Sequence, residues 1–188
     1  KIKRANIQFV FIPLLVNRDG SRLKYPHGFQ STVMLLRPKS RGSITIKSND
    51  PLISPTIKFN YLEKKSDLIE LREGIRAIRK IFKQPSFKPY LGKEISPGNI
   101  NTSDKELNLF IKNNATSTYH PSGTCKMGCN KHEAVVDQDC KVIGLNGLRV
   151  VDASVFPKIT SGNINAPVMM LAEKISDQIL NSNKNYKK

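Results

Sequence analysis

The sequence lacks three features that would each point to a particular class of protein. No apolar run reaches the roughly 18 residues that suggest a membrane-spanning helix. No G-x-G-x-x-G segment follows a strand-like stretch, so the chain has no dinucleotide-binding fingerprint of its own. Internal repeats and low-complexity segments are also missing. The 188 residues are therefore expected to form one globular domain, or one and a half, without a transmembrane segment.

Acidic residues are scarce. Lys and Arg number 31 against 15 Asp and Glu, which gives a net charge of +16 and favours association with anions. The basic residues are spread along the whole chain, however, and the few aromatic residues (7%) are not interleaved with Arg. Nucleic-acid binders gather such residues into a patch, so we expect no nucleic-acid partner. A basic module that binds a polyanion stays a less favoured alternative.

Cysteines are few and odd in number, which argues against a disulfide framework. Cys125, Cys129 and His132 superficially suggest metal ligation, but a structural zinc site needs four ligands at tighter, paired spacings. We expect that the cysteines bind no metal. They are expected to be small buried thiols and one thiol on a loop. A Cys129–Cys140 disulfide stays open if the protein is secreted, and the sequence does not decide the localisation.

The first two thirds of the chain predict short strands followed by two helices. Strand-like segments lie at residues 7–12, 32–37, 43–48 and 56–59. A helix over residues 66–83 is expected to be capped by Ser66. Its apolar face is formed by Leu68, Leu71, Ile75, Ile78 and Phe82. The capping box between Ser103 and Glu106 opens a second helix that carries Leu107, Phe110 and Ile111.

The last third predicts short strands and one terminal helix. Strand candidates lie at residues 135–136, 141–143 and 148–151. The helix is expected to begin at Pro167, a favoured first helical position, and to run to about Leu180. Its first half is apolar all round, which predicts burial. The whole pattern is that of an α+β fold.

His120 is a candidate general base. Pro121 disfavours helical geometry at His120, and Gly123 permits a tight turn, so the imidazole is held on a short, stiff loop. Histidine is a natural base at neutral pH. Taken alone, a single histidine on a turn is more often a purely structural residue, because geometry and partners decide whether it acts as a base.

The segment before the last helix is a second candidate. Asn163 and Asn165 precede Pro167, and the helix N-terminus offers unpaired N–H groups that stabilise an anion. Asn165 could instead be a simple N-cap. Asp152 follows a strand-like stretch and could bind a hydroxyl group of a ligand or cap a local turn; spacing alone does not choose between these two roles.

Several stretches, in order, resemble the glucose–methanol–choline (GMC) flavoprotein oxidoreductases. They are residues 36–42 with 48–51, 119–128, 147–157 and 161–174. The resemblance covers nearly the whole chain and is greatest to insect glucose-dehydrogenase-like and choline-dehydrogenase-like members. It implies an antiparallel or mixed sheet with flanking helices, plus the C-terminal strand and helix of an FAD-binding domain. Residues 1–115 would form the substrate-binding region, 116–182 the catalytic histidine turn and the return to the FAD domain, and 183–188 a basic tail.

The resemblance also implies FAD as cofactor and an alcohol or sugar as substrate, oxidised at a CH–OH group with hydride transfer to the flavin. His120 would be the catalytic base or acid, and Asn163 would occupy the second catalytic position. The residues implied to touch FAD are Asp152, Ala153, Asn165, Ala166 and Pro167.

The FAD-binding N-terminal region of such an enzyme is missing from the sequence. The chain begins at Lys1 and looks like a fragment that starts within a domain. We therefore expect the isolated chain to be inactive. The missing FAD-binding region is its expected partner. A truncated, non-catalytic remnant without flavin is the main alternative.

Overall fold

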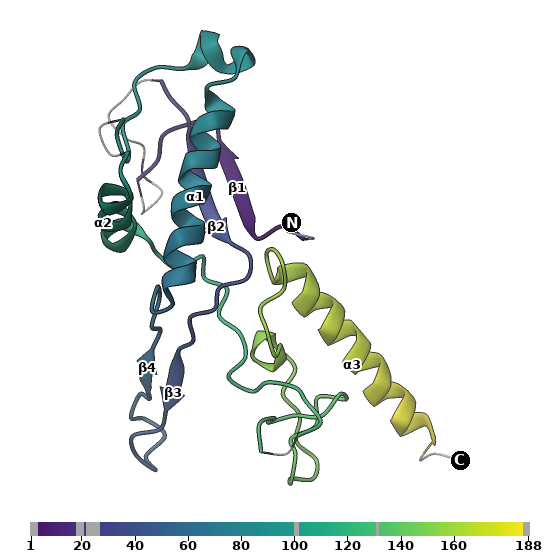
Figure 1. The fold of residues 1–188 in the computed structure, drawn as a ribbon. Helices are drawn as coiled ribbons and strands as arrows, with labels where there is room; N and C mark the ends of the chain where they lie inside the picture. Colours follow the sequence, from purple (N-terminus) through teal and green to yellow (C-terminus); the bar gives the residue numbers. More distant parts are fainter. Residues whose placement is uncertain (1–3, 18–20, 22–26, 100–101, 131, 186–188) are drawn as a thin grey trace. The chain divides into compact units, whose positions relative to one another are not determined.

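The computed structural model describes residues 4–17, 21, 27–99, 102–130 and 132–185. The chain divides into two compact units. The first comprises residues 1–42 and 59–116, and the second comprises residues 43–58 and 117–188. Each unit is described by itself (Figure 1). The expected basic tail lies outside the described residues, apart from the backbone of residues 183–185.

The first unit is built on a two-stranded antiparallel sheet. Strand β1 (Ile7–Ile12) pairs with β2 (Gln30–Leu35), so that Ile7 lies opposite Leu35. The strand expected at residues 32–37 thus begins two residues earlier and ends at Leu35. The pairing ends just beyond it with the Leu36 N–H, which donates to the Asn6 carbonyl oxygen (2.9 Å), and Pro38 further on has no N–H group to donate. The strand is half-buried, since a helix covers one face of the sheet.

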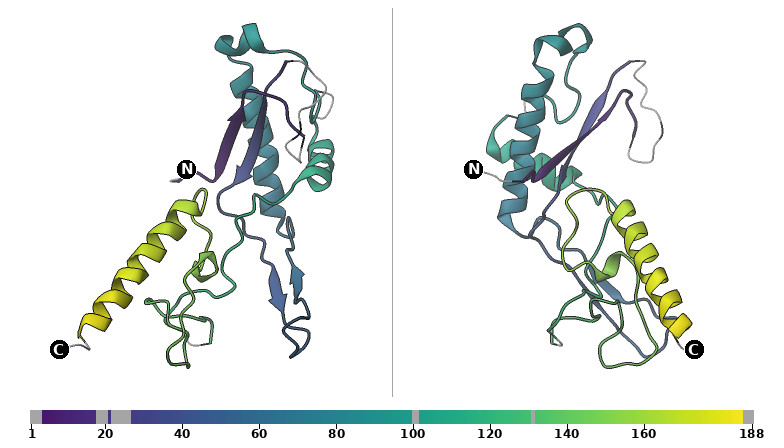
Figure 2. Two further views of the ribbon diagram at one scale, coloured as in Figure 1. Left: turned by 180° about the vertical axis from the view of Figure 1, so that it is seen from behind. Right: turned by 90° about the vertical axis from the view of Figure 1, so that its right-hand side faces the viewer.

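Helix α1 (Lys65–Phe82) is that covering helix (Figures 1 and 2). Leu68 and Ile75 are buried on the expected apolar face, which is confirmed. Gly74 lies at the closest approach to the sheet. A Cβ atom at Gly74 would lie 2.5 Å from the Val33 Cγ1 atom, so only glycine lets the helix pack this closely.

The start of α1 corrects one expectation, because Ser66 is not its cap. Lys64 occupies the N-cap position, and its side chain makes no capping hydrogen bond. Instead the Ser40 hydroxyl accepts a hydrogen bond from the Lys64 N–H (3.0 Å) and donates one to the buried Asp67 carboxylate (2.6 Å). A loop distant in sequence therefore supplies the polar partner that a local cap would otherwise provide.

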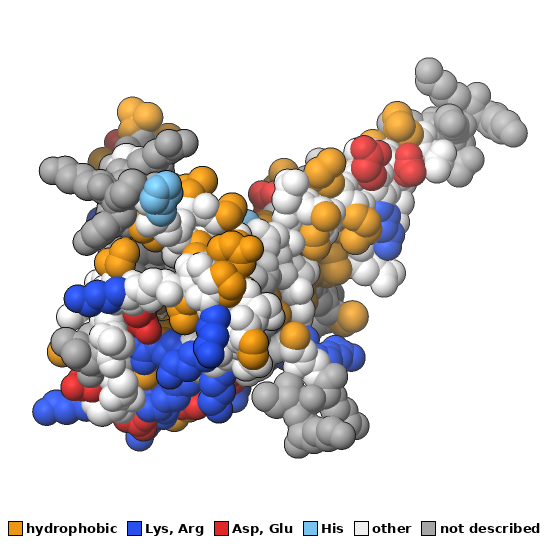
Figure 3. All heavy atoms as spheres, turned by 90° about the horizontal axis from the view of Figure 1, so that it is seen from above, with side chains coloured by type: hydrophobic (Ala, Val, Ile, Leu, Met, Phe, Trp, Pro, Cys, Tyr) orange, Lys and Arg blue, Asp and Glu red, His pale blue; other side chains and the backbone are white. Residues whose placement is uncertain are grey.

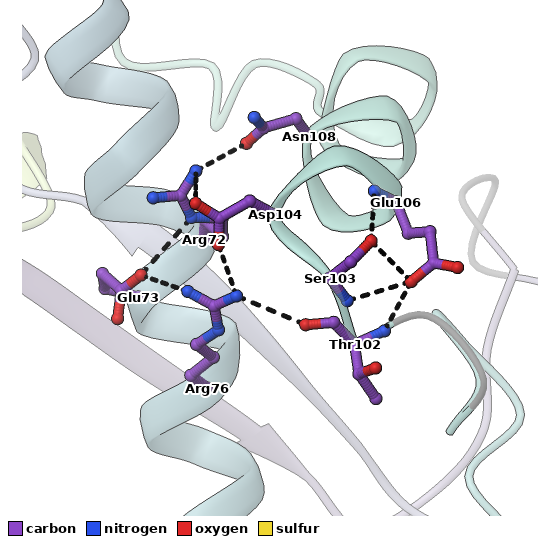
Figure 4. A network of polar contacts seen from close by, with 8 residues as sticks. All are labelled: Arg72, Glu73, Arg76, Thr102, Ser103, Asp104, Glu106 and Asn108. Carbon is purple, nitrogen blue, oxygen red and sulfur yellow. Dashed lines mark hydrogen bonds and ion pairs between the residues drawn. The ribbon is translucent and has the colours of Figure 1, made fainter.

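Helix α2 (Asp104–Asn114) begins with the expected capping box, which is confirmed. The Ser103 hydroxyl accepts from the Glu106 N–H (3.2 Å), and the Glu106 carboxylate accepts from the Ser103 N–H (2.9 Å). Arg72 and Arg76 of α1 both pair with Asp104, at 3.0 and 2.6 Å (Figure 4). Leu107 and Ile111 of α2 complete the core under α1. A short 3-10 helix, η1 (Pro85–Tyr90), follows α1.

The second unit is mostly irregular. Strands β3 (Ser43–Thr45) and β4 (Thr56–Lys58) form a separate antiparallel hairpin. The prediction of strands between residues 135 and 151 is wrong. In the described chain these residues form isolated β-bridges, such as that between Val136 and Val142. Cys140, Gly144 and Gly147 all have positive φ angles, which interrupt the extended backbone every few residues.

Helix α3 (Asn165–Asn185) begins two residues before the expected position. Pro167 is tolerated in its first turn because the N–H groups there have no intrahelical acceptor. Leu171 and Ile175 are buried in a core with Val136, Cys140 and Val155. Met169 and Met170 are exposed, so this chain by itself does not bury the helix all round. Figure 3 shows hydrophobic side chains on the visible side of α3.

Helix α1, packed between a small antiparallel sheet and α2, together with the hairpin and helix of the second unit, confirms the α+β class. Among the described residues, no helix is long and apolar enough to cross a membrane.

Candidate active site

The turn that carries His120 is held in an uncommon backbone conformation. Tyr119, the preceding residue, has a φ angle of +60°, which a bulky side chain rarely adopts. Its N–H donates to the Ser117 hydroxyl (2.9 Å), and the residue as a whole is 85% exposed. His120 itself is half-buried. The surrounding structure must maintain this conformation, because the turn would not adopt it readily alone.

Backbone contacts supply that support from a segment about 30 residues away in the sequence. The Cys125 N–H donates to the Ser154 carbonyl oxygen (3.0 Å), and the Met127 N–H donates to the Val155 carbonyl oxygen (2.8 Å). Gly123 has a φ angle of +92°, and a Cβ atom there would lie 3.3 Å from the Phe156 carbonyl oxygen. The turn after His120 therefore lies directly against residues 154–156.

Asp152 organises the segment that receives the turn. It precedes a one-turn 3-10 helix, η2 (Ala153–Val155), and its Oδ1 atom accepts hydrogen bonds from the Ser154 N–H (2.8 Å) and the Ser154 hydroxyl. The structure thus shows Asp152 as a local cap, one of the two roles left open by the sequence. The role of Asp152 and Ala153 toward FAD stays a prediction.

The start of α3 lies nearby in the chain and belongs to the same unit. The Val168 N–H donates to the Ile164 carbonyl oxygen (3.0 Å), so Ile164 occupies the N-cap position. The alternative that Asn165 is the N-cap is therefore wrong, because Asn165 is the first helical residue. Asn163, Asn165 and Ala166 are exposed, and Pro167 is half-buried.

The structure thus joins two of the sequence motifs directly and the third indirectly. Backbone bonds join the His120 turn to residues 154–155, and Val155 packs in one core with Leu171 and Ile175 of α3. The hydrogen bonds of the described residues do not join His120 to residues 163–167. No signal in the sequence marks Ser154 and Val155 as the residues that hold the turn, because a carbonyl acceptor can belong to any residue type.

The three cysteines are not paired with one another. All three are free, with Cys129 exposed and Cys140 buried, so the structure does not contain the Cys129–Cys140 disulfide. Burial raises the pKa of the Cys140 thiol, and the nearby Asp137 raises it further. Within the described residues, no three His, Cys, Asp or Glu side chains are grouped so that they could hold a metal ion.

Comparison with known proteins identifies the family. A model of the C-terminal part of GMC oxidoreductases matches residues 38–172, which is most of the chain. The chain belongs to the GMC oxidoreductase family. The resemblance carried by the motifs is therefore confirmed, including its restriction to the C-terminal part of the family.

Two curated relatives are oxygen-dependent choline dehydrogenases. That of Brucella anthropi is 47% identical over 180 residues, which are 95% of this chain and 33% of the relative. That of Acinetobacter baumannii is 49% identical over 179 residues, which are 95% of this chain and 32% of the relative. The chain thus spans about a third of the length of the curated relatives it matches.

Solved structures of family members have the same fold. A variant of the formate oxidase of Aspergillus oryzae, studied for its FAD modification, matches with a TM-score of 0.89 and 31% identity. The match covers 98% of this chain and 33% of that protein. An FAD-dependent oxidoreductase from Chaetomium thermophilum matches 84% of this chain with a TM-score of 0.78, also at 31% identity. The individual site residues stay predictions.

Proposed function

We propose that this chain forms the C-terminal part of an FAD-dependent oxidoreductase that oxidises a CH–OH group of a small alcohol or sugar. One observation carries the proposal beyond family membership. The two backbone bonds from Cys125 and Met127 to Ser154 and Val155 place the His120 turn against the segment that leads to α3. A candidate base and a helix N-terminus thereby belong to one compact unit.

The described residues fit FAD at the start of α3. The first turn of a helix has N–H groups without intrahelical acceptors and a partial positive charge, which suit an electron-rich ligand edge. Asn165 and Ala166 are exposed there. The Thr160 hydroxyl oxygen, just upstream, is buried without a hydrogen-bond partner in the described part of the chain. When bound, FAD would accept the hydride from the substrate carbon.

The chain's own residues would bind and orient the substrate oxygen and remove its proton. The neutral imidazole of His120 would accept the hydroxyl proton, and the side-chain amide of Asn163 would donate a hydrogen bond to the same oxygen. The N-terminus of α3 would stabilise negative charge that develops nearby. Because the curated relatives act on choline, we propose a small primary alcohol of that kind as the first candidate substrate.

The test uses a chimaera in which this chain replaces the matching third of the Brucella anthropi relative. Flavin reduction is followed after mixing with choline and other primary alcohols. His120→Ala should retain bound FAD and slow reduction by roughly 10²–10⁴-fold, the usual effect of losing a general base. His132→Ala is the matched control, because His132 is an exposed histidine on another loop. Reduction at the parent rate in His120→Ala would refute the assignment.

Asn163 is tested in the same chimaera against Asn165. Asn163→Ala should lower kcat more than it raises KM, since the amide would act mainly in the transition state. Asn165→Ala should mainly weaken FAD binding. The reverse pattern would show that the two roles are exchanged.

A further inference from the structure

The β3–β4 hairpin has the side-chain pattern of a sheet with one buried face. In its register Ile44 lies opposite Ile57, while Ser43 lies opposite Lys58 and Thr45 opposite Thr56. Side chains alternate between the two faces of a strand, so Ile44 and Ile57 share one face; Ile46, the first residue after β3, follows the same alternation in the sequence. The other face carries Ser, Thr and Lys. Such alternation is typical of an antiparallel sheet that packs on a core with one face only.

The apolar face of this hairpin is nevertheless exposed. Ile44 and Ile57 are 49% and 52% exposed, and Ile46 is 81% exposed. Leu52, in the connection between the strands, is 89% exposed. Its N–H donates to the Asp50 carboxylate (2.9 Å), so the connection is ordered by its own hydrogen bonds while its apolar side chain is left in solvent. The pattern predicts a buried face, but no described part of the chain buries these side chains.

An isolated two-stranded hairpin is at best marginally stable in water and needs a hydrophobic face packed on something else. The solved formate oxidase matches 98% of this chain at a TM-score of 0.89, yet the match is only 33% of that protein. The fold described for this chain is therefore found within proteins about three times as long.

We propose that the apolar face of the hairpin, formed by Ile44, Ile46 and Ile57 with Leu52 at the tip, is an intramolecular docking surface. Its occupant is an apolar surface of the remaining two thirds of a full-length GMC oxidoreductase. The opposite face, with Thr45 and Lys58, stays in solvent. This inference concerns assembly and does not rest on the proposed reaction.

The proposal is tested by the rate of thiol labelling at two neighbouring positions. Ile46→Cys places a thiol on the apolar face, and Thr45→Cys, the matched control, places one on the polar face; both side chains are exposed in this chain. Each variant is made in the 188-residue chain and in the Brucella anthropi chimaera. Alkylation with iodoacetamide is followed by mass spectrometry of the hairpin peptide. This readout requires neither turnover nor bound substrate.

We expect alkylation of Ile46→Cys to be at least about tenfold slower in the chimaera than in the 188-residue chain, the protection given by a packed surface that opens only locally. Alkylation of Thr45→Cys should proceed at similar rates in both. Equal rates for Ile46→Cys in the two proteins, or equal protection of both positions, would overturn the proposal. Protection of Ile46→Cys in the 188-residue chain that increases with protein concentration would assign the face to a second copy and would also overturn it.

A charged substitution gives a second, independent measurement in the chimaera. Ile46→Lys should lower the thermal unfolding midpoint of the chimaera, since the charge would have to be buried under the docked surface. Thr45→Lys should leave the midpoint unchanged. Equal midpoints for the two variants would contradict the proposal even if flavin reduction were normal.

Discussion

The two units differ in how far each satisfies its own packing. In the first unit, Leu107 and Ile111 are buried under α1, and ion pairs from Arg72 and Arg76 hold the start of α2. In the second unit, a small core lies under α3, but the β3–β4 hairpin and the outer side of the helix leave apolar side chains in solvent. The first unit also leaves apolar side chains such as Phe11 and Leu109 in solvent, but in the second unit the exposed Ile44 and Ile57 share one face of a hairpin.

Core truncations test this difference with the largest expected effect. Leu107 is fully buried in the first unit and Ile175 is nearly so in the second. Leu107→Ala and Ile175→Ala should each lower the unfolding free energy of their unit by about 2–5 kcal/mol, from lost burial and the cavity left behind. Urea unfolding of the 188-residue chain is the measurement. Leu109→Ala, on the exposed side of α2, is the control and should cost less than about 0.5 kcal/mol.

If both truncations shifted one common transition by the same amount, the two units would unfold as a single cooperative body. The distinction between a self-sufficient unit and an incomplete one would then fail.

Asp67→Ala should have the next largest effect and should be confined to the first unit. The Asp67 carboxylate accepts hydrogen bonds from the Lys39 N–H (2.9 Å), the Ser40 N–H (2.8 Å) and the Ser40 hydroxyl. Its removal leaves two backbone N–H groups without acceptors and should cost roughly 2–4 kcal/mol. Measurement is again by urea unfolding, with Asp67→Asn expected to lose less because it retains one acceptor oxygen.

The same carboxylate predicts a pH dependence. Burial acts to raise the pKa of Asp67, but hydrogen bonds from the Ser40 side chain and the Lys39 and Ser40 backbone outweigh it and hold the pKa below its ordinary value of 3.8. The folded state therefore favours the charged form. The stability contributed is fully present above that ordinary pKa and is lost as the pH falls through it and below. Unfolding free energies of Asp67→Ala and the parent should converge in acid; a constant difference would contradict this account.

In the second unit, Gly123→Ala should cost about 1–3 kcal/mol, since the backbone has a positive φ angle and the added Cβ would press on the Phe156 carbonyl oxygen. Gly147→Ala is the matched control. Gly147 also has a positive φ angle, but no atom lies within 4 Å of the added Cβ. The difference between the two variants in urea unfolding isolates the contact between the His120 turn and residue 156. Equal costs would mean that this contact contributes nothing.

The smallest effect compares two serines of the first unit. Ser103→Ala should cost about 1 kcal/mol, because its hydroxyl caps α2. Ser66→Ala should cost less than about 0.5 kcal/mol, because α1 has no side-chain cap of its own. Helix content and urea midpoints measure both. A loss in Ser66→Ala as large as that in Ser103→Ala would restore Ser66 as a cap.

The sequence by itself determined the features that depend on local periodicity and local side-chain chemistry. The bounds of β1, the apolar face of α1 and the capping box at Ser103 all follow from residues within a few positions of one another. The order of motifs from residue 36 to residue 174 likewise established the family.

Only the tertiary structure decided the features that depend on backbone groups of distant segments. The start of α1 is set by Ser40 and Asp67, and the His120 turn is held by the carbonyl oxygens of Ser154 and Val155. Every residue has such a carbonyl group, so no residue type marks the one that will accept. The sequence also does not mark what covers Met169 on α3, because an apolar pattern shows that a face is suited to burial and leaves open which part of the protein buries it.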